Sequence, residues 1–249
     1  MIEGKVQHTS TALAHATMIA AQVLGGTSVL LLAIFLFHGP FHFIDLRLSI
    51  PTALGLDGLL CLMFFVQHSG MVRQSFRHRL EALLPGHFSG ALYAIASGVV
   101  LCALLLFWQP TALTLVSIDG PGRWLLRGGF IIAILGFVWG AWALGAFDPF
   151  GIRPIKAHLR GKTLRDVPLT IHGPYKWVRH PLYACVLLLF WCYPDLTADR
   201  LLFNTMWTVW VVVATVLEER DLVRLFGEPY RAYQRKVPML LPWRLPGNG

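Results

Sequence analysis

Six apolar segments dominate the sequence, and they limit the folds open to it more than any other feature does. Apolar runs of roughly 17–25 residues are long enough to cross a bilayer as helices. Only 14% of the residues are charged and the mean hydropathy is +0.59, whereas a soluble domain usually carries about 25% charged residues. We therefore predict an all-α integral membrane protein, a bundle of about six transmembrane helices. The segments are 16–37, 51–66, 88–108, 124–147, 181–193 and 201–217.

The second and fifth segments depart from a plain apolar helix. Asp57 interrupts the second, and because a carboxylate at mid-membrane costs roughly 2.5–3.5 kcal/mol, we expect it to face the bundle interior, in a functional or a structural role. The fifth stays apolar only from Pro181 to Tyr193, which gives about 20 Å of helix. It either continues past Pro194 with a kink or forms a short hairpin with the sixth segment.

The basic residues lie between the apolar segments and predict an orientation. The net charge of +8 would suit a nucleic-acid partner, but lysines and arginines in this position orient helices in a membrane. If the N-terminal side is the inner one, most of them fall on that side, around 73–79, 153–179 and 220–244, and the outer side keeps only Arg47, Arg123, Arg127 and Arg200. This bias predicts that both termini are cytoplasmic, in a bacterial inner membrane, with membrane lipids rather than nucleic acid around the protein.

The start of the chain and the cysteines give narrower expectations. The N-terminal MIEGKVQHTSTALAHAT has no short apolar core with a cleavage site, so we interpret it as a short cytoplasmic tail and not a signal peptide. The four cysteines lie in or beside apolar segments and form no CxxC pair. Buried free thiols are expected there, with no disulfide and no metal site. They are Cys61, Cys102, Cys185 and Cys192.

One polar and basic stretch, GPYKWVRHPLY at 173–183, leads directly into the fifth apolar segment. Proline is preferred at the first position of a helix, so a helix is predicted to start at Pro181. Arg179 and His180 then lie at its positive, N–H-rich end, which attracts a carboxylate or another anionic group. The alternative is an ordinary solvated helix end.

A second polar cluster, Glu218-Glu219-Arg220-Asp221, closes the last apolar segment. On the predicted topology both clusters face the cytoplasm, so we expect them to meet and form a single site. The tail that follows predicts a helix, a break at Gly227 and a new short helix from Pro229, in which Tyr230 and Tyr233 share a face. We divide the chain into helices 1–4 at 1–147 and a catalytic, cofactor-binding region at 148–249.

These motifs resemble a known family. GPYKWVRHPLY, followed by EERDLVRLFGEPYRAYQRKVPMLLP, is similar to the membrane methyltransferases that include isoprenylcysteine carboxyl methyltransferase and the phospholipid methyltransferases. This likeness covers roughly residues 148–243. Two upstream stretches, FVQHSGMVRQSF at 65–76 and FDPFGIRP at 147–154, look like the methanethiol S-methyltransferase branch of these proteins.

The resemblance implies S-adenosyl-L-methionine as the cofactor, bound on the cytoplasmic side. The chemistry of the matching residues agrees: Gly173 permits close backbone approach, Glu218 can accept hydrogen bonds from a ribose or meet an amino group, and tyrosine rings can face a sulfonium cation. The implied cofactor-binding residues are Leu169, Thr170, Gly173, Tyr175, His180, Pro181, Leu182, Tyr183 and Glu218.

One departure from the family's pattern narrows the choice of methyl acceptor. In the prenylcysteine enzymes an arginine is expected one turn before the glutamates, to meet the substrate carboxylate, and here that position is Ala214. A small neutral or thiol acceptor such as methanethiol, converted to dimethyl sulfide, therefore fits better. Within the enzyme class the alternative acceptor is a lipid, either a prenylcysteine carboxylate or a phospholipid amine. Outside it, a membrane transporter is the competing class, although the sequence shows no inverted repeat.

Methyl transfer from a sulfonium mainly requires positioning of the reactants and exclusion of water. A thiol acceptor must also lose its proton, which a basic group assists. His68 is the first candidate base, against the alternative of a satisfied polar helix end, and His180 is the second, against a role in cofactor contact. Asp148 and Arg153 follow the fourth segment and either line an acceptor pocket or pair with one another. The acceptor's identity and the oligomeric state stay open.

Overall fold

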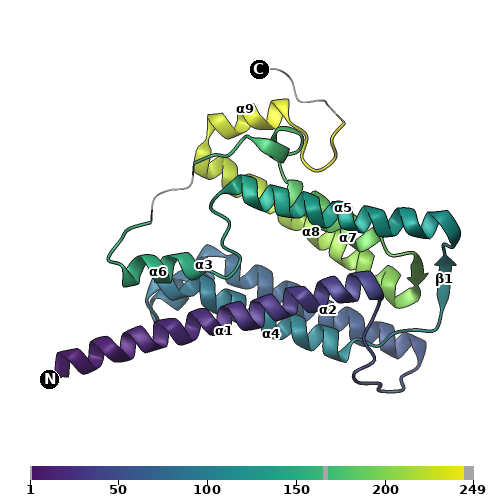
Figure 1. Cartoon of the computed structure of the whole chain (residues 1–249), viewed down its shortest axis with the longest axis horizontal. Helices are drawn as coiled ribbons and strands as arrows, with labels where there is room; N and C mark the ends of the chain where they lie inside the picture. The colour runs from purple at the N-terminus through teal and green to yellow at the C-terminus, as the bar shows by residue number, and fades with distance from the viewer. Residues whose placement is uncertain (1, 165–167, 244–249) are drawn as a thin grey trace. The chain divides into compact units, whose positions relative to one another are not determined.

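The computed structural model of the chain describes residues 2–164 and 168–243. Arg165 and Arg244, which belong to the basic segments assigned to the inner side, lie outside them. The elements, labelled in Figure 1 where there is room, are α1 (Ile2–His38), α2 (Ile50–Val72), α3 (Gln74–Glu81), η1 (Gly86–Phe88), α4 (Ser89–Phe107), β1 (Thr114–Ser117), α5 (Gly120–Leu144), α6 (Ile152–Leu159), η2 (Gly173–Lys176), α7 (Pro181–Trp191), β2 (Asp195–Thr197), α8 (Ala198–Phe226) and α9 (Glu228–Lys236).

Five helical stretches among the described residues are long and apolar enough to cross a membrane, and α7 is a shorter apolar helix. These elements match the apolar segments of the sequence and confirm the prediction of an all-α integral membrane protein. The five are Thr11–His38, Ile50–Val72, Gly86–Phe107, Gly120–Leu144 and Ala198–Phe226.

The fifth apolar segment forms a hairpin with the sixth. Helix α7 ends at Trp191, and α8 begins at Ala198 after the short strand β2. Phe190 of α7 packs edge-on against Phe203 and Trp207 of α8, with ring centroids 5.7 and 5.8 Å apart. The helix therefore does not continue through Pro194, and the hairpin is the correct one of the two alternatives.

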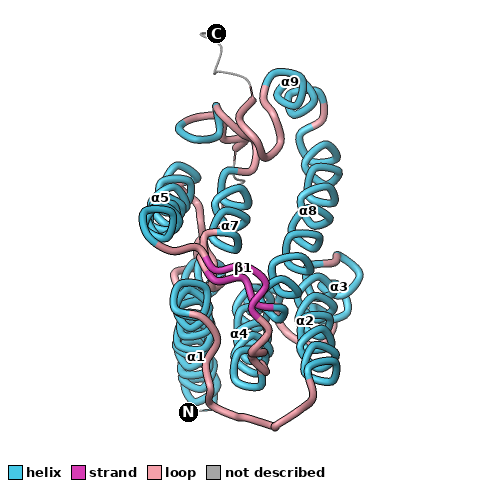
Figure 2. Tube along the Cα trace, turned by 90° about the vertical axis from the view of Figure 1, so that its right-hand side faces the viewer, coloured by secondary structure: helices cyan, strands magenta, loops and turns pink. Residues whose placement is uncertain are grey.

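Two features were not predicted. Helix α1 begins at Ile2, so the residues interpreted as a tail extend the first helix. Strands β1 and β2 form a small antiparallel pair, drawn in magenta in Figure 2. Asp195 of β2 accepts hydrogen bonds from Arg123 and Ser117, and the bond from the Arg123 guanidinium lowers the pKa of this carboxyl group.

The chain forms two compact units. Unit 1 comprises Met1–Pro110 and Asp148–Asp166, and unit 2 comprises Thr111–Phe147 and Val167–Gly249. The division predicted from the sequence, with its boundary after residue 147, groups α5 with the N-terminal helices. In the structure α5 belongs to unit 2, where it packs against α7. The division into 1–147 and 148–249 remains a prediction about function.

In unit 1, α1 and α4 cross closely at small residues, as is typical of membrane helices. A Cβ atom on Gly98 would lie 2.8 Å from the main-chain carbonyl of Leu24. Asp57 is fully buried, as expected, and its Oδ1 accepts the backbone N–H of Gln109 beyond the end of α4. This contact gives Asp57 a structural role in joining α2 to the end of α4.

In unit 2, α5 presents small residues to α7. A Cβ atom on Gly136 would lie 2.9 Å from the Cys185 sulfur, and one on Gly129 would lie 3.0 Å from the Cys192 sulfur. Both cysteines are free thiols, as are Cys61 and Cys102. The glycines thus let α7 lie directly on α5.

Candidate functional site

The candidate site in unit 2 is built where α7 begins. The helix starts at Pro181, as predicted from the proline. The two residues before it are tied to the C-terminal segment, because the backbone N–H groups of Arg179 and His180 donate to the carbonyls of Pro238 and Met239 at 2.9 and 3.1 Å. The loop that carries the basic residues is therefore held by main-chain hydrogen bonds.

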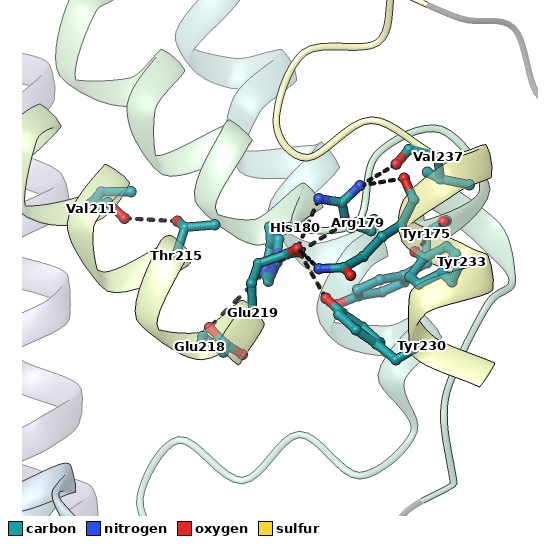
Figure 3. A network of polar contacts seen from close by, with 11 residues as sticks. Tyr175, Arg179, His180, Val211, Thr215, Glu218, Glu219, Tyr230, Tyr233 and Val237 are labelled. Atoms are coloured by element: carbon teal, nitrogen blue, oxygen red, sulfur yellow. Dashed lines mark hydrogen bonds and ion pairs between the residues drawn. The ribbon is translucent and has the colours of Figure 1, made fainter. Parts of the chain in front are cut away.

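Glu219 joins the two polar clusters of the sequence (Figure 3). Its carboxylate accepts two hydrogen bonds from the Arg179 guanidinium, each 2.8 Å, and lies 2.7 Å from Nε2 of His180. Tyr230 donates its hydroxyl to the same carboxylate at 2.8 Å, and Gln234 of α9 donates its side-chain amide. The expectation that the two clusters meet is confirmed.

The tyrosines of this region are neutral hydrogen-bond donors. Burial raises the pKa of the Tyr230 phenol, and its hydrogen bond to Glu219 raises it further. Burial also raises the pKa of Tyr233, whose hydroxyl donates to the backbone carbonyl of Tyr175. The two side chains lie on one face of α9, as predicted, and both are buried. They attach α9 to the loop before α7.

Glu218, the neighbouring carboxylate, is in a different situation. Its Oε2 atom is buried and accepts no hydrogen bond from the described residues, although it lies 4.0 Å from Nδ1 of His180. The side chain as a whole is 43% exposed. Burial first, and then the charge of Glu218, raise the pKa of the nearby Tyr175. An unsatisfied carboxylate oxygen is costly unless a ligand or water supplies a donor.

The other residues implied for the cofactor also belong to unit 2. Tyr175 and Pro181 are buried, while Leu169, Thr170, Leu182 and Tyr183 are half-buried. The rings of His180 and Tyr183 stack with centroids 5.6 Å apart. Gly173 has a φ of +60°, and a Cβ atom there would lie 3.2 Å from that of Ala143. A left-handed turn packed on α5 thus accounts for this glycine.

The candidate base His68 lies in unit 1, on α2. Its Nε2 contacts the hydroxyl of Tyr93, and its Nδ1 lies 3.2 Å from the hydroxyl of Ser97. Both contacts come from α4. The half-buried imidazole is therefore held by two hydroxyl groups, so it is both a satisfied polar group and a basic nitrogen beside a phenol.

Asp148 and Arg153, the candidate acceptor residues, also belong to unit 1. The Asp148 carboxylate accepts the backbone N–H groups of Ile152 and Arg153 at 3.1 and 2.8 Å, which are orphan donors at the start of α6. The exposed Arg153 side chain makes no ion pair with Asp148 in the part of the chain that the structure describes. The two residues are linked through the main chain.

Sequence reasoning singled out Glu218 and missed the central position of Glu219. The signal was present in the spacing of α8. Phe203, Trp207, Val211 and Thr215 form a buried row at every fourth residue, and Glu219 is the next member of that row. Because residues four apart share a helix face, the row would have predicted which glutamate turns inward. The partners Tyr230 and Gln234 give no comparable local signal.

Comparison with known proteins adds independent information. A methanethiol S-methyltransferase of Pseudomonas deceptionensis is 36% identical over 199 residues, which are 78% of this chain and 74% of the relative. The protein of that name from Crocosphaera subtropica is 32% identical over 196 residues, 78% of this chain and 77% of the relative. The chain belongs to the methanethiol S-methyltransferase family.

A more distant relative was also found, and two other comparisons gave no match. Nurim of Rattus norvegicus is 25% identical over 210 residues, 77% of this chain and 75% of that protein. No model in a collection of protein families matches the chain. No solved structure matches it. Membership of the methanethiol S-methyltransferase family confirms the resemblance drawn from GPYKWVRHPLY and from the two upstream stretches.

Proposed function

We propose that the protein is a membrane-embedded methyltransferase that uses S-adenosyl-L-methionine and methylates a small thiol such as methanethiol, giving dimethyl sulfide. The observation that carries this proposal is the buried, unsatisfied Oε2 of Glu218 beside His180 at the start of α7. A nucleoside hydroxyl or an ammonium group would supply the missing donor.

The residues around Glu218 fit such a donor molecule. When bound, S-adenosyl-L-methionine supplies a methyl group already activated by the positive sulfur. Glu218 would bind its ribose or amino group, and the N-terminal end of α7 at Pro181 would favour its carboxylate. The aromatic rings of Tyr175 and Tyr183 would face the positive charge. Glu219 holds Arg179 and His180 in position through hydrogen bonds at 2.7–2.8 Å, so the start of α7 is preorganised.

The acceptor is proposed on two grounds. Ala214 lies on α8 one turn before Glu218, so it offers no positive charge to a substrate carboxylate, which disfavours a prenylcysteine acceptor. Relatives that are 36% and 32% identical over 78% of the chain are named methanethiol S-methyltransferases. These grounds favour a thiol over a lipid acceptor, and methyltransferase relatives favour an enzyme over a transporter. Asp148 and Arg153 remain proposed acceptor residues, with Asp148 acting through α6.

The decisive experiment measures the binding of S-adenosyl-L-methionine to two variants of the detergent-purified full chain, one at Glu218 and one at Asp221. Glu218→Gln removes the charge of the unsatisfied carboxylate while keeping its shape. Because a hydrogen bond to a charged group contributes about 1.5–3 kcal/mol, we expect calorimetric binding of S-adenosyl-L-methionine to weaken by roughly 10–100-fold. Dimethyl sulfide formation from methanethiol, followed by gas chromatography, should fall in parallel.

The matched control is Asp221→Asn, one turn further along α8, where an exposed carboxylate pairs with Arg224. This variant should bind the donor as the unmodified chain does. Equal binding by Glu218→Gln and the unmodified chain would contradict the assignment of Glu218. No binding of the donor to the folded, unmodified chain would overturn the methyltransferase proposal itself.

A further inference from the structure

Several helices of unit 1 meet where two long apolar helices end. Helix α2 ends at Val72 and α4 begins at Ser89, and both are long and apolar enough to cross a bilayer. The short helices α3 and α6 both pack on α4 and on η1 before it. The contact with α6 is very close, because a Cβ atom on Gly90 would lie 2.9 Å from the Cα atom of Gly151. This end of unit 1 therefore lies at a membrane boundary.

A hollow of about 180 Å³ lies at this end of unit 1. Its walls come from the last turn of α2, from α3 and from the first two turns of α4. They are mainly apolar, with hydroxyl groups from one serine and one tyrosine. An apolar cavity of about 150 Å³ is large enough for benzene, so the hollow can hold part of an acyl chain. The lining residues are Met71, Val72, Leu80, Ser89, Gly90 and Tyr93.

Two exposed arginines are direct neighbours of lining residues. Arg73 follows Val72, and Arg79 precedes Leu80. Neither arginine forms an ion pair with a residue that the structure describes. A guanidinium group binds phosphate oxygens through two parallel hydrogen bonds. The apolar hollow thus has positive charge beside it on two elements.

Helix α6 adds two more cations at the same end of unit 1. Arg153 and Lys156 are exposed and pair with no carboxylate within residues 2–164 and 168–243. Asp148, the nearest acidic residue in the sequence, is engaged elsewhere, because its two oxygens accept the backbone N–H groups of Ile152 and Arg153 at 3.1 and 2.8 Å. The carboxylate caps the helix, so the two side chains are available to an external anion.

We propose that this end of unit 1 binds an anionic phospholipid, with its phosphate on the basic side chains and part of an acyl chain in the hollow. Lysines and arginines beside a membrane helix attract anionic headgroups. A phospholipid carries both the negative charge that suits the cations and the apolar chain that suits the hollow, whereas a soluble anion carries only the charge. The basic rim consists of Arg73, Arg79, Arg153 and Lys156. This inference goes beyond the proposed methyl transfer and does not depend on it.

The test compares two lipids that have the same chains and different headgroups. The full chain in a neutral detergent is titrated with dioctanoyl phosphatidylglycerol, which is anionic, and with dioctanoyl phosphatidylcholine, which has no net charge. Native mass spectrometry counts the bound lipid. We expect tighter binding of the phosphatidylglycerol, and the difference should shrink as salt rises, because the Debye length is only about 10 Å at 0.1 M ionic strength.

Two double variants remove the basic rim in halves. Each lysine or arginine near the surface contributes about fivefold to headgroup binding. Arg73→Gln with Arg79→Gln should therefore raise the Kd of phosphatidylglycerol by roughly 25-fold, and Arg153→Gln with Lys156→Gln should do the same. The Kd of phosphatidylcholine should stay nearly constant. The four side chains are exposed, so the melting temperature without added lipid should not change.

Three single variants complete the design. Arg47→Gln removes an exposed arginine in the loop at the other end of α2, and it should leave both Kd values unchanged. Leu80→Trp fills the hollow and should weaken the binding of phosphatidylglycerol. Its matched control is Leu83→Trp, at a residue that is 82% exposed and does not line the hollow, which should bind as the unmodified chain does.

The outcomes separate a lipid site from the alternatives. Equal affinity of the unmodified chain for the two lipids would overturn the proposal, as would a preference for phosphatidylglycerol that survives both double variants. Equal effects of Leu80→Trp and Leu83→Trp would remove the acyl chain from the hollow. Displacement of the lipid by an equal concentration of glycerophosphoglycerol, the same headgroup without chains, would assign the cations to a soluble phosphate. Lipid binding is measured without methyl transfer, so these outcomes leave the proposed function to its own test.

Discussion

At the scale of single residues, the candidate site depends on a buried charge pair. The side chains of Arg179 and Glu219 are each only 10% exposed, and the guanidinium also donates to the backbone carbonyls of Gln234 and Val237. Removing one partner of a buried pair leaves an uncompensated charge, which costs far more than the pair itself contributes. Glu219 is therefore the residue whose loss should disturb unit 2 most.

We predict that Glu219→Leu lowers the free energy of unfolding by about 3–5 kcal/mol, because Arg179 keeps its charge and loses both carboxylate hydrogen bonds. Thermal unfolding of the purified chain in detergent measures this. The double variant Arg179→Met with Glu219→Leu should recover part of the loss, since no charge is left unpaired.

The matched control for this prediction is Glu228→Gln, which breaks a surface pair with Arg235 whose side chains are 69% and 64% exposed. Its melting temperature should be unchanged. If Glu219→Leu melts like this control, the network of Figure 3 is not a stabilising one.

At the scale of elements, α5 and α7 are matched in shape by a row of glycines. Membrane helices associate through close packing of small residues, since lipid provides no hydrophobic drive. Gly136 faces the Cys185 sulfur, and Gly140 faces the Leu182 side chain, where a Cβ atom would lie 2.8 Å away. Leu182 directly follows Pro181, so this packing positions the start of α7 and the site around it.

Enlarging Gly136 and then shrinking the facing Cys185 tests this contact between α5 and α7. In Gly136→Ala the new methyl group meets the Cys185 sulfur at 2.9 Å, and overpacking of this kind typically costs about 1–3 kcal/mol. The melting temperature should fall, and adding Cys185→Ala should restore it. Gly128→Ala, on the same helix with nothing within 4 Å of its Cβ position, should be neutral or stabilising, because alanine favours helix by about 1 kcal/mol. Equal effects of Gly128→Ala and Gly136→Ala would contradict the packing.

At the scale of the whole molecule, the charge pattern predicts an orientation. If each of the four long apolar helices before α7 crosses the membrane, the chain returns to its starting side before the α7–α8 hairpin, which begins and ends on that side. The positive-charge bias then predicts that this side is the cytoplasm. The predicted membrane topology thus rests mainly on the placement of lysines and arginines in the sequence.

Cysteine labelling in intact bacteria tests the orientation. Asp119→Cys, at a side chain that is 84% exposed, should react with a membrane-impermeant maleimide. Lys162→Cys, exposed in the loop after α6, should react only after the cells are opened. The unmodified chain, with its four cysteines in or beside apolar helices, provides the background. The reverse labelling pattern would invert the topology.

Much of the fold was determined by the sequence alone, because the responsible interactions are local. Apolar length predicts the membrane helices, Pro181 predicts the start of α7, and Gly227, with a φ of +64°, predicts the break before α9. These features depend on the conformational limits of a residue and its near neighbours. Sequence alone did not choose between a kink and a hairpin at Pro194, since that choice depends on the packing of Phe190 against α8.

Only the tertiary structure decided which polar residues meet. Arg179 and Glu219 are 40 residues apart in the chain, and His68 and Tyr93 are 25 apart. Their pairing depends on how helices pack, and a pattern in one segment does not encode its distant partner. The sequence therefore predicted that the two polar clusters would meet. The structure decided that Glu219 binds the basic residues, while Oε2 of Glu218 accepts no hydrogen bond from the described part of the chain, because adjacent residues on a helix point about 100° apart.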